Sequence, residues 1–200
     1  MVYLIVIFCA MLALVLGNFA AAEHTLLSFG AISLDVVLCV AIVFVIDATL
    51  AAAARALPKR WFAPTNRLFT VKEWERRLYR RLGLNAWKKY VPELGCFTGF
   101  HKDHLRDPLS SEYIGRFLTE SHYGVVGHLW GGFFGGVILF LPFWNPLTVA
   151  LPVVVLNFIL SNLPTMILRY NTPPLLRLYQ RNLARENKKR EAESLTEISS

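Results

Sequence analysis

Four apolar runs dominate the sequence and leave little choice of fold. They cover residues 3–22, 29–57, 125–141 and 147–168, with Asp35 and Asp47 interrupting the second run. A helix of about 20 apolar residues crosses the hydrocarbon core of a bilayer. The hydrophobic share of 54% also exceeds that of ordinary soluble domains. The runs predict an all-α integral membrane protein, multi-pass in the cell membrane, with about four transmembrane helices.

The first run also has features of a secretory signal peptide. Ala20, Ala21 and Ala22 precede Glu23 as small residues precede a signal-peptidase site. No Lys or Arg stands before the run, however, and it is longer than a typical signal-peptide core. These differences favour a retained helix, with cleavage as the alternative.

Positive charge is concentrated in two segments. Residues 59–89 carry ten Lys or Arg against two Glu, and seven more Lys or Arg follow between residues 169 and 190. Residues 142–146 have no charge, as expected of a tight turn at the outer interface. By the positive-inside rule, both basic segments and both termini are expected on the cytoplasmic side.

The predicted organisation has four parts. Residues 1–58 form a transmembrane hairpin, 59–123 a basic amphipathic cytoplasmic segment, 124–171 a second hairpin and 172–200 a basic tail, with 188–200 expected to be disordered. Because the charge flanks the membrane, the net charge of +7 indicates anionic lipid headgroups as partners and no nucleic acid. The three cysteines have no paired or metal-type spacing.

Residues 71–82 have the pattern of a basic amphipathic helix. The apolar residues Val71, Trp74, Leu78 and Leu82 recur at helical spacing, and the remaining face is charged, with Lys72, Glu73, Glu75, Arg76, Arg77 and Arg80. Such a helix lies in the headgroup plane. It serves as a membrane anchor or, alternatively, its arginines hold an anionic donor.

The mouth of the third apolar run contains an acid and two histidines, Glu120, His122 and His128. Ionisable side chains are expensive to place in a membrane, so these are the first candidates for function. On one continuous helix Glu120 and His128 lie roughly 12 Å apart along the axis, too far for a hydrogen bond. Gly127, Gly131 and Gly135 form small-xxx-small steps that admit a close helix, from this chain or from a second copy in a homo-oligomer.

Two other interpretations of these residues compete with catalysis. His128 could hydrogen-bond another helix while Glu120 pairs with an arginine such as Arg169. A metal site could use His101 and His104 with the three residues above, but the spacing matches no metal motif, so no metal is predicted. In the fourth run, Pro164 is expected to kink the helix beside Asn162.

Residues 74–180 resemble the glycosyl-4,4'-diaponeurosporenoate acyltransferase family. The resemblance rests on the order and spacing of short motifs: Trp87-Lys88, Pro92-Glu93, Phe100 with Lys102, Glu120 with His128, Asn162-Leu163-Pro164, Arg169-Tyr170-Asn171 and Arg177. The chain departs from the family pattern at Tyr123-Gly124-Val125, where the family has Arg-Ala-Glu, and at Thr172-Pro173, where it has Asn-Arg.

The resemblance implies transfer of a fatty acyl group to a sugar hydroxyl of a glycosylated isoprenoid, such as a carotenoid, or a related glycolipid. It makes His128 the general base, Glu120 an orienting acid and His122 the reserve base. Asn162 or Asn171 would stabilise the oxyanion. The acyl donor, acyl-CoA or another, is a substrate, so no cofactor is expected, and its phosphates would bind Arg169, Lys102 and the basic helix.

The other motif residues are expected to bind substrate: Trp87, Lys88, Glu93, Tyr170 and Arg177. The alternative function is a non-catalytic lipid-binding or membrane-complex assembly protein, whose glycine face would pack against a partner. A third possibility is a metal-dependent enzyme acting on lipid chains.

Overall fold

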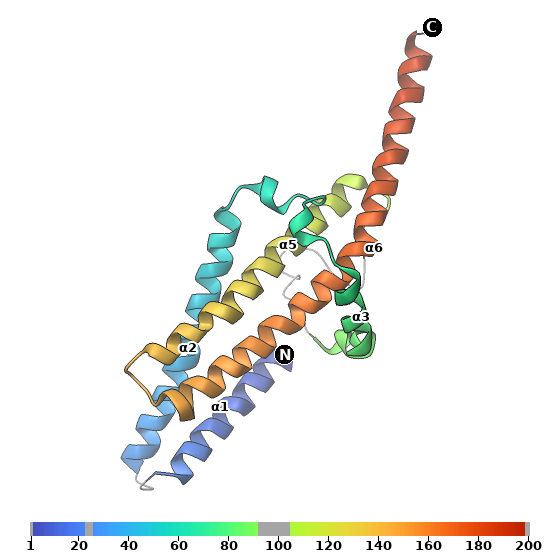
Figure 1. The fold of residues 1–200 in the computed structure, drawn as a ribbon. Helices are drawn as coiled ribbons and strands as arrows, with labels where there is room; N and C mark the ends of the chain where they lie inside the picture. The colour runs from blue at the N-terminus through green and yellow to red at the C-terminus, as the bar shows by residue number, and fades with distance from the viewer. Residues whose placement is uncertain (1, 23–25, 92–104, 199–200) are drawn as a thin grey trace.

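A computed structural model describes residues 2–22, 26–91 and 105–198 (Figure 1). Its long helices are α1 (Val2–Ala20), α2 (Leu26–Ala56), α5 (Ser111–Phe134) and α6 (Leu151–Ile198). The short ones are η1 (Lys59–Phe62), η2 (Arg67–Phe69), α3 (Glu73–Arg81), α4 (Leu84–Trp87), η3 (Lys88–Tyr90), η5 (Gly135–Phe140) and η6 (Pro146–Ala150). No strand occurs in the described part of the chain, so the all-α prediction is confirmed.

Three helical stretches are long and apolar enough to cross a membrane: Ser28–Ala56, Ser111–Phe140 and Pro146–Thr196. They agree with the second, third and fourth predicted spans. The first predicted span is a shorter apolar helix, Leu4–Ala20. The protein is therefore an all-helical membrane protein with three spanning-length helices and a shorter fourth.

Helix α5 begins 14 residues before the predicted third span. The Ser110 hydroxyl caps it by accepting a hydrogen bond of 3.1 Å from the Tyr113 amide, and Ile114 and Leu118 then bury a first apolar face. Glu120 and His122 are consequently inside a helix, and the predicted boundary between residues 123 and 124 falls within it. Charged side chains in the first turns lower the mean hydropathy of this segment, so its apolar face was not predicted from the sequence.

The glycines of α5 bring two helices close to it, as their spacing predicted. A Cβ at Gly127 would lie 3.6 Å from Ala51 of α2, and one at Gly124 would lie 2.9 Å from Leu168 of α6. The small residues therefore let α5 pack tightly between α2 and α6. These contacts are within one chain, so the glycines need no second copy to explain them.

Helix α6 is assigned without a break past Pro164, Pro173 and Pro174. The Asn162 side-chain amide donates to the Phe158 carbonyl at 2.7 Å, and the kink expected at Pro164 stays a prediction. The helix continues through residues 188–198, where disorder was expected, because that segment is rich in helix-forming Lys, Glu, Arg and Ala. That prediction of disorder was wrong for the described residues.

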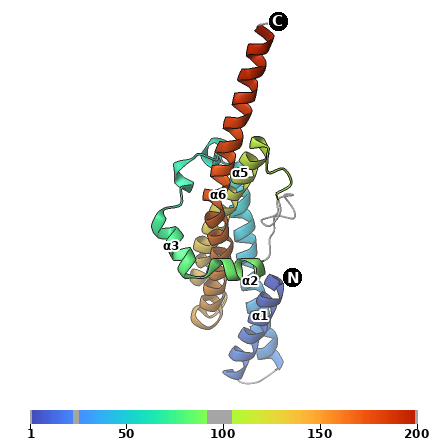
Figure 2. The ribbon, with the colours of Figure 1, turned by 90° about the vertical axis from the view of Figure 1, so that its right-hand side faces the viewer.

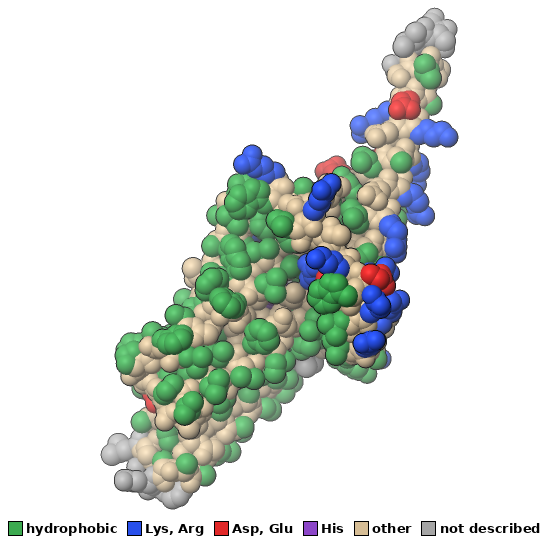
Figure 3. Space-filling view, in the orientation of Figure 1, with side chains coloured by type: hydrophobic (Ala, Val, Ile, Leu, Met, Phe, Trp, Pro, Cys, Tyr) green, Lys and Arg blue, Asp and Glu red, His purple; other side chains and the backbone are tan. Residues whose placement is uncertain are grey.

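The two basic segments lie at one end of the bundle, which we call the basic end. In Figure 1 the C-terminal end of α1, the start of α2 and residues 141–145 gather at the lower left. The end of α2 and the start of α5 lie toward the top of the bundle, the tail of α6 extends to the upper right, and α3 is beside α6 in both ribbon views (Figures 1 and 2). Figure 3 shows hydrophobic side chains over the lower left and Lys and Arg over α3 and the tail.

Candidate functional site

Glu120 lies at the basic end in a large polar pocket. The pocket has a volume of about 610 Å³, and its walls come from η1, the first half of α5 and Tyr179 of α6. The Arg55 guanidinium donates to the Glu120 carboxylate at 2.8 Å. The arginine expected opposite Glu120 is thus Arg55 of α2, not Arg169. With 30% of its side chain exposed, Glu120 is open to a ligand that enters the pocket.

His122 is buried in an aromatic cluster. Its ring stacks on Phe69 with centroids 3.9 Å apart, its Nδ1 is 3.1 Å from the Phe62 carbonyl oxygen, and none of its surface is exposed. Phe62 also stacks on Tyr123. The cluster fastens residues 59–70 across α5. In this conformation the His122 ring cannot meet a substrate hydroxyl, so the geometry favours a packing role.

His128 lies two turns deeper on α5 than Glu120. It is one turn from Gly124, which approaches α6, and one turn from Gly132, where a Cβ would lie 3.1 Å from Ser161. Residues four apart share a helix face, so His128 is on the side of α5 that faces α6. The half-buried ring has no hydrogen-bond partner among the described residues. Its ring nitrogens are therefore not engaged by any described residue.

Asn162 is the oxyanion candidate nearest to His128. A Cβ at Gly132 would lie 3.9 Å from its amide nitrogen, which places Asn162 about one turn from His128. Asn171 is nine residues further along α6, roughly 13 Å away, and Arg177 is exposed beyond it. Glu93, Lys102, His101 and His104 lie outside the described residues. Of the two asparagines, Asn162 is the closer to the level of His128.

Arg169 makes a bidentate ion pair with Glu75 of α3. Arg169 Nη2 donates to Glu75 Oε2 at 2.8 Å, Arg169 Nε donates to Oε1, and the Tyr79 hydroxyl donates to Oε1 as well. Burial raises the pKa of Glu75, but the bonds from Arg169 and Tyr79 lower it by more, so the net pKa is below its usual range. Burial and the Glu75 carboxylate raise the pKa of Tyr79. Arg169 is therefore neutralised within the protein.

Helix α3 is amphipathic as predicted and its apolar stripe is exposed, but one acid of the predicted charged face is buried. Glu75, placed on the charged face, has only 7% of its side chain exposed, whereas Trp74, Leu78 and Leu82 are exposed. The apolar stripe points away from the protein, which suits contact with lipid. Glu75 and Tyr79 are four residues apart, so they share a face of α3 that differs from the face of the apolar stripe. This spacing could have indicated a polar contact between them.

Three of the predicted substrate-binding residues meet beside this ion pair. The Asn85 amide donates to the Tyr170 hydroxyl at 3.0 Å, Lys88 Nζ lies 5.5 Å from the centre of the Tyr170 ring, and Trp87 Nε1 donates to the Leu82 carbonyl at 3.0 Å. The family motifs around Trp87 and Arg169 thus form one contact between α3–α4 and α6. These groups hold the amphipathic segment on the bundle.

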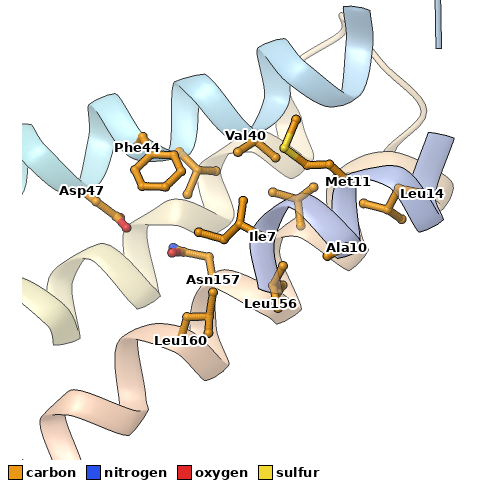
Figure 4. A pocket seen from close by; sticks show the side chains of 12 residues that line it. Ile7, Ala10, Met11, Leu14, Val40, Phe44, Asp47, Leu156, Asn157 and Leu160 are labelled. Atoms are coloured by element: carbon orange, nitrogen blue, oxygen red, sulfur yellow. The ribbon is translucent and has the colours of Figure 1, made fainter. Parts of the chain in front are cut away.

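Asp47 and Asn157 form a polar pair inside the bundle, and the sequence analysis did not predict it as a site. In Figure 4, Asp47 of α2 and Asn157 of α6 point toward one another at the edge of a small apolar cavity of about 50 Å³. Asp47 Oδ1 is buried without a hydrogen-bond partner in the described chain. Cβ atoms at Gly131 and Gly135 would lie 2.6 Å from Asp47 Oδ1 and 2.5 Å from Asn157 Nδ2. An acid within an apolar run was the signal for this site.

Among the described residues, no group of three or more His, Cys, Asp and Glu is placed to hold a metal.

Comparison with known proteins gives one match. The family model of glycosyl-4,4'-diaponeurosporenoate acyltransferase matches residues 58–181, more than half of the chain. The chain belongs to this family. It is accordingly an acyltransferase family member, and the matched range includes α3, α5, the pocket lining and the Arg169 contact, but not α1 and α2. No curated protein and no solved structure matches the chain.

Proposed function

We propose that the protein transfers a fatty acyl group to a sugar hydroxyl of a glycosylated isoprenoid or related glycolipid. The observation that carries the proposal is the arrangement along α5. Glu120 lies in an open pocket at the basic end, and His128, with unengaged ring nitrogens, lies deeper on α5, about one turn from Asn162. A polar entrance above an apolar bundle suits an amphiphilic acceptor and a fatty acyl chain. We expect this end to face the cytoplasm.

In the proposed reaction His128 is the general base. A sugar hydroxyl is a weak nucleophile, and a neutral imidazole can take its proton as the oxygen attacks the acyl carbonyl carbon. The new C–O ester bond forms, and the bond from the carbonyl carbon to the donor's leaving atom breaks. For a thioester donor, the proton held by His128 passes to the departing thiolate. The Asn162 amide is the group we assign to the oxyanion.

Glu120 has a different role because eight residues separate it from His128. At 1.5 Å per residue the two lie roughly 12 Å apart along the helix, so the carboxylate does not orient the imidazole directly. We assign Glu120 to the acceptor sugar. Its pair with Arg55 is partly exposed, and such pairs contribute about 1 kcal/mol or less. A sugar hydroxyl can therefore displace Arg55 at small cost.

Lipid mass spectrometry tests the proposal directly. Cells supplied with glycosylated isoprenoid or glycolipid acceptors would express wild type, His128→Ala, Glu120→Gln or Glu73→Gln at matched membrane levels. Glu73 is an exposed acid on α3 and controls for loss of a carboxylate. A lipid heavier by one fatty acyl group should appear with wild type and Glu73→Gln and be lost with the other two. If no such lipid depends on wild type, the protein is instead a lipid-binding or assembly factor.

A further inference from the structure

The pocket around Glu120 holds more positive charge than its acids can neutralise. Lys59 and Arg60 of η1 and Arg116 of α5 line it, and all three are exposed. Within the described chain none of the three has an ion-pair or hydrogen-bond partner. Because Arg55 already neutralises Glu120, Glu112 is the one lining carboxylate left to offset the three cations.

Three other arginines of the basic segments are already paired. Glu75 occupies Arg169, and Glu73 accepts from Arg76 at 3.1 Å and from Arg80 at 3.2 Å. Arg169 was the sequence-based candidate for the donor's phosphates, and its bidentate pair with Glu75 leaves it unsuited to that task. Lys59, Arg60 and Arg116, in contrast, are unpaired among the described residues and line a concave space.

We propose that Lys59, Arg60 and Arg116 bind the phosphate group of the acyl donor. This inference rests on the proposed function and names the donor's binding site. Guanidinium groups form paired hydrogen bonds with phosphate oxygens, and a lysine adds a compact charge. A phosphate held at Arg116 lies twelve residues, roughly 18 Å along α5, from His128, so the donor's acyl carbon must extend inward along α5 to react there. Acyl-CoA and acyl phospholipids share this phosphate chemistry.

Equilibrium binding of CoA to the full-length protein in phosphatidylcholine nanodiscs provides the test. The pocket variant is Lys59→Gln/Arg60→Gln/Arg116→Gln. The control, Lys72→Gln/Arg77→Gln/Arg81→Gln, removes the same charge from exposed positions of the α3 segment. The pocket variant should weaken CoA binding at least about tenfold, and the control less than about threefold. The single Arg116→Gln variant repeats the test if the triple variant does not fold.

A second arm distinguishes the source of the phosphate. If wild type does not bind CoA, native mass spectrometry after purification with phosphatidylglycerol should show bound phospholipid that the pocket variant loses and the control retains. Equal losses in both variants, or no change in either ligand, would overturn the phosphate site. Acyl transfer that persists in the pocket variant would leave the proposed reaction standing without this site. CoA binding without any acylated product would support the phosphate site and contradict the proposed reaction.

Discussion

Glu75 and Arg169, 94 residues apart in the sequence, form a bidentate ion pair that joins the amphipathic helix α3 to α6. The Tyr79 hydroxyl donates to the same carboxylate, and Asn85 and Lys88 contact the neighbouring Tyr170. This contact keeps the exposed face of Trp74, Leu78 and Leu82 directed away from the bundle. It therefore sets which face of α3 is left exposed.

Breaking the Glu75–Arg169 pair should destabilise the protein strongly. Glu75→Gln leaves the Arg169 charge buried without a counter-charge, and loss of one partner of a buried pair costs about 3–5 kcal/mol. Thermal unfolding in detergent should show a large fall in Tm for Glu75→Gln. Glu73→Gln breaks only exposed pairs and should change Tm little. Equal Tm values for the two variants would contradict this role.

The contribution of the pair should depend on pH. The pKa of Glu75 is lower in the folded protein than in the unfolded chain, so its stabilisation is fully present above the ordinary carboxyl pKa. It is lost as the pH falls through the depressed pKa of the folded state. The difference in Tm between wild type and Glu75→Gln should therefore be constant near neutral pH and shrink in acid. A difference in Tm that grows as the pH falls would contradict a lowered pKa of Glu75 in the folded protein.

Gly131→Ala should destabilise the bundle because its Cβ would lie 2.6 Å from Asp47 Oδ1. Overpacking of this kind costs about 1–3 kcal/mol. Gly136→Ala is the matched control, since a Cβ there meets nothing within 4 Å. In a double-mutant cycle Asp47→Ala should recover part of the loss by removing the colliding carboxylate. Additive effects of the two substitutions would show that they do not touch.

The two histidines of α5 should separate stability from catalysis. His122→Ala removes the ring stacked on Phe69 and should lower Tm, while the folded protein keeps kcat/KM within about threefold. His128→Ala should keep Tm near that of wild type and lower kcat about 10²-fold or more, as expected for loss of a general base. Acyl transfer in nanodiscs, normalised to folded protein, measures both. If His122→Ala loses activity and His128→Ala does not, His122 is the general base and His128 is not.

Hydrophobic patterning predicted the four long helices, but not the first part of α5 or the tail of α6. The apolar runs, the small residues of α5 and the basic flanks gave the all-α class, the close helix contacts and the common side of the two basic segments. Each of these depends on neighbours along the chain, through helical spacing or the cost of placing charge in lipid. The family motifs likewise pointed to the segments that the structure brings together around Trp87 and Tyr170.

Tertiary structure alone decided which polar groups meet. Glu75 looks like a solvent-facing acid from its neighbours, yet it is buried because α3 docks on Arg169. His122 looks like a reactive residue, yet residues 59–70 fold over it. Glu120 pairs with Arg55 because α2 packs along α5. Such pairings depend on contacts between residues more than 50 positions apart, and local spacing carries no information about them.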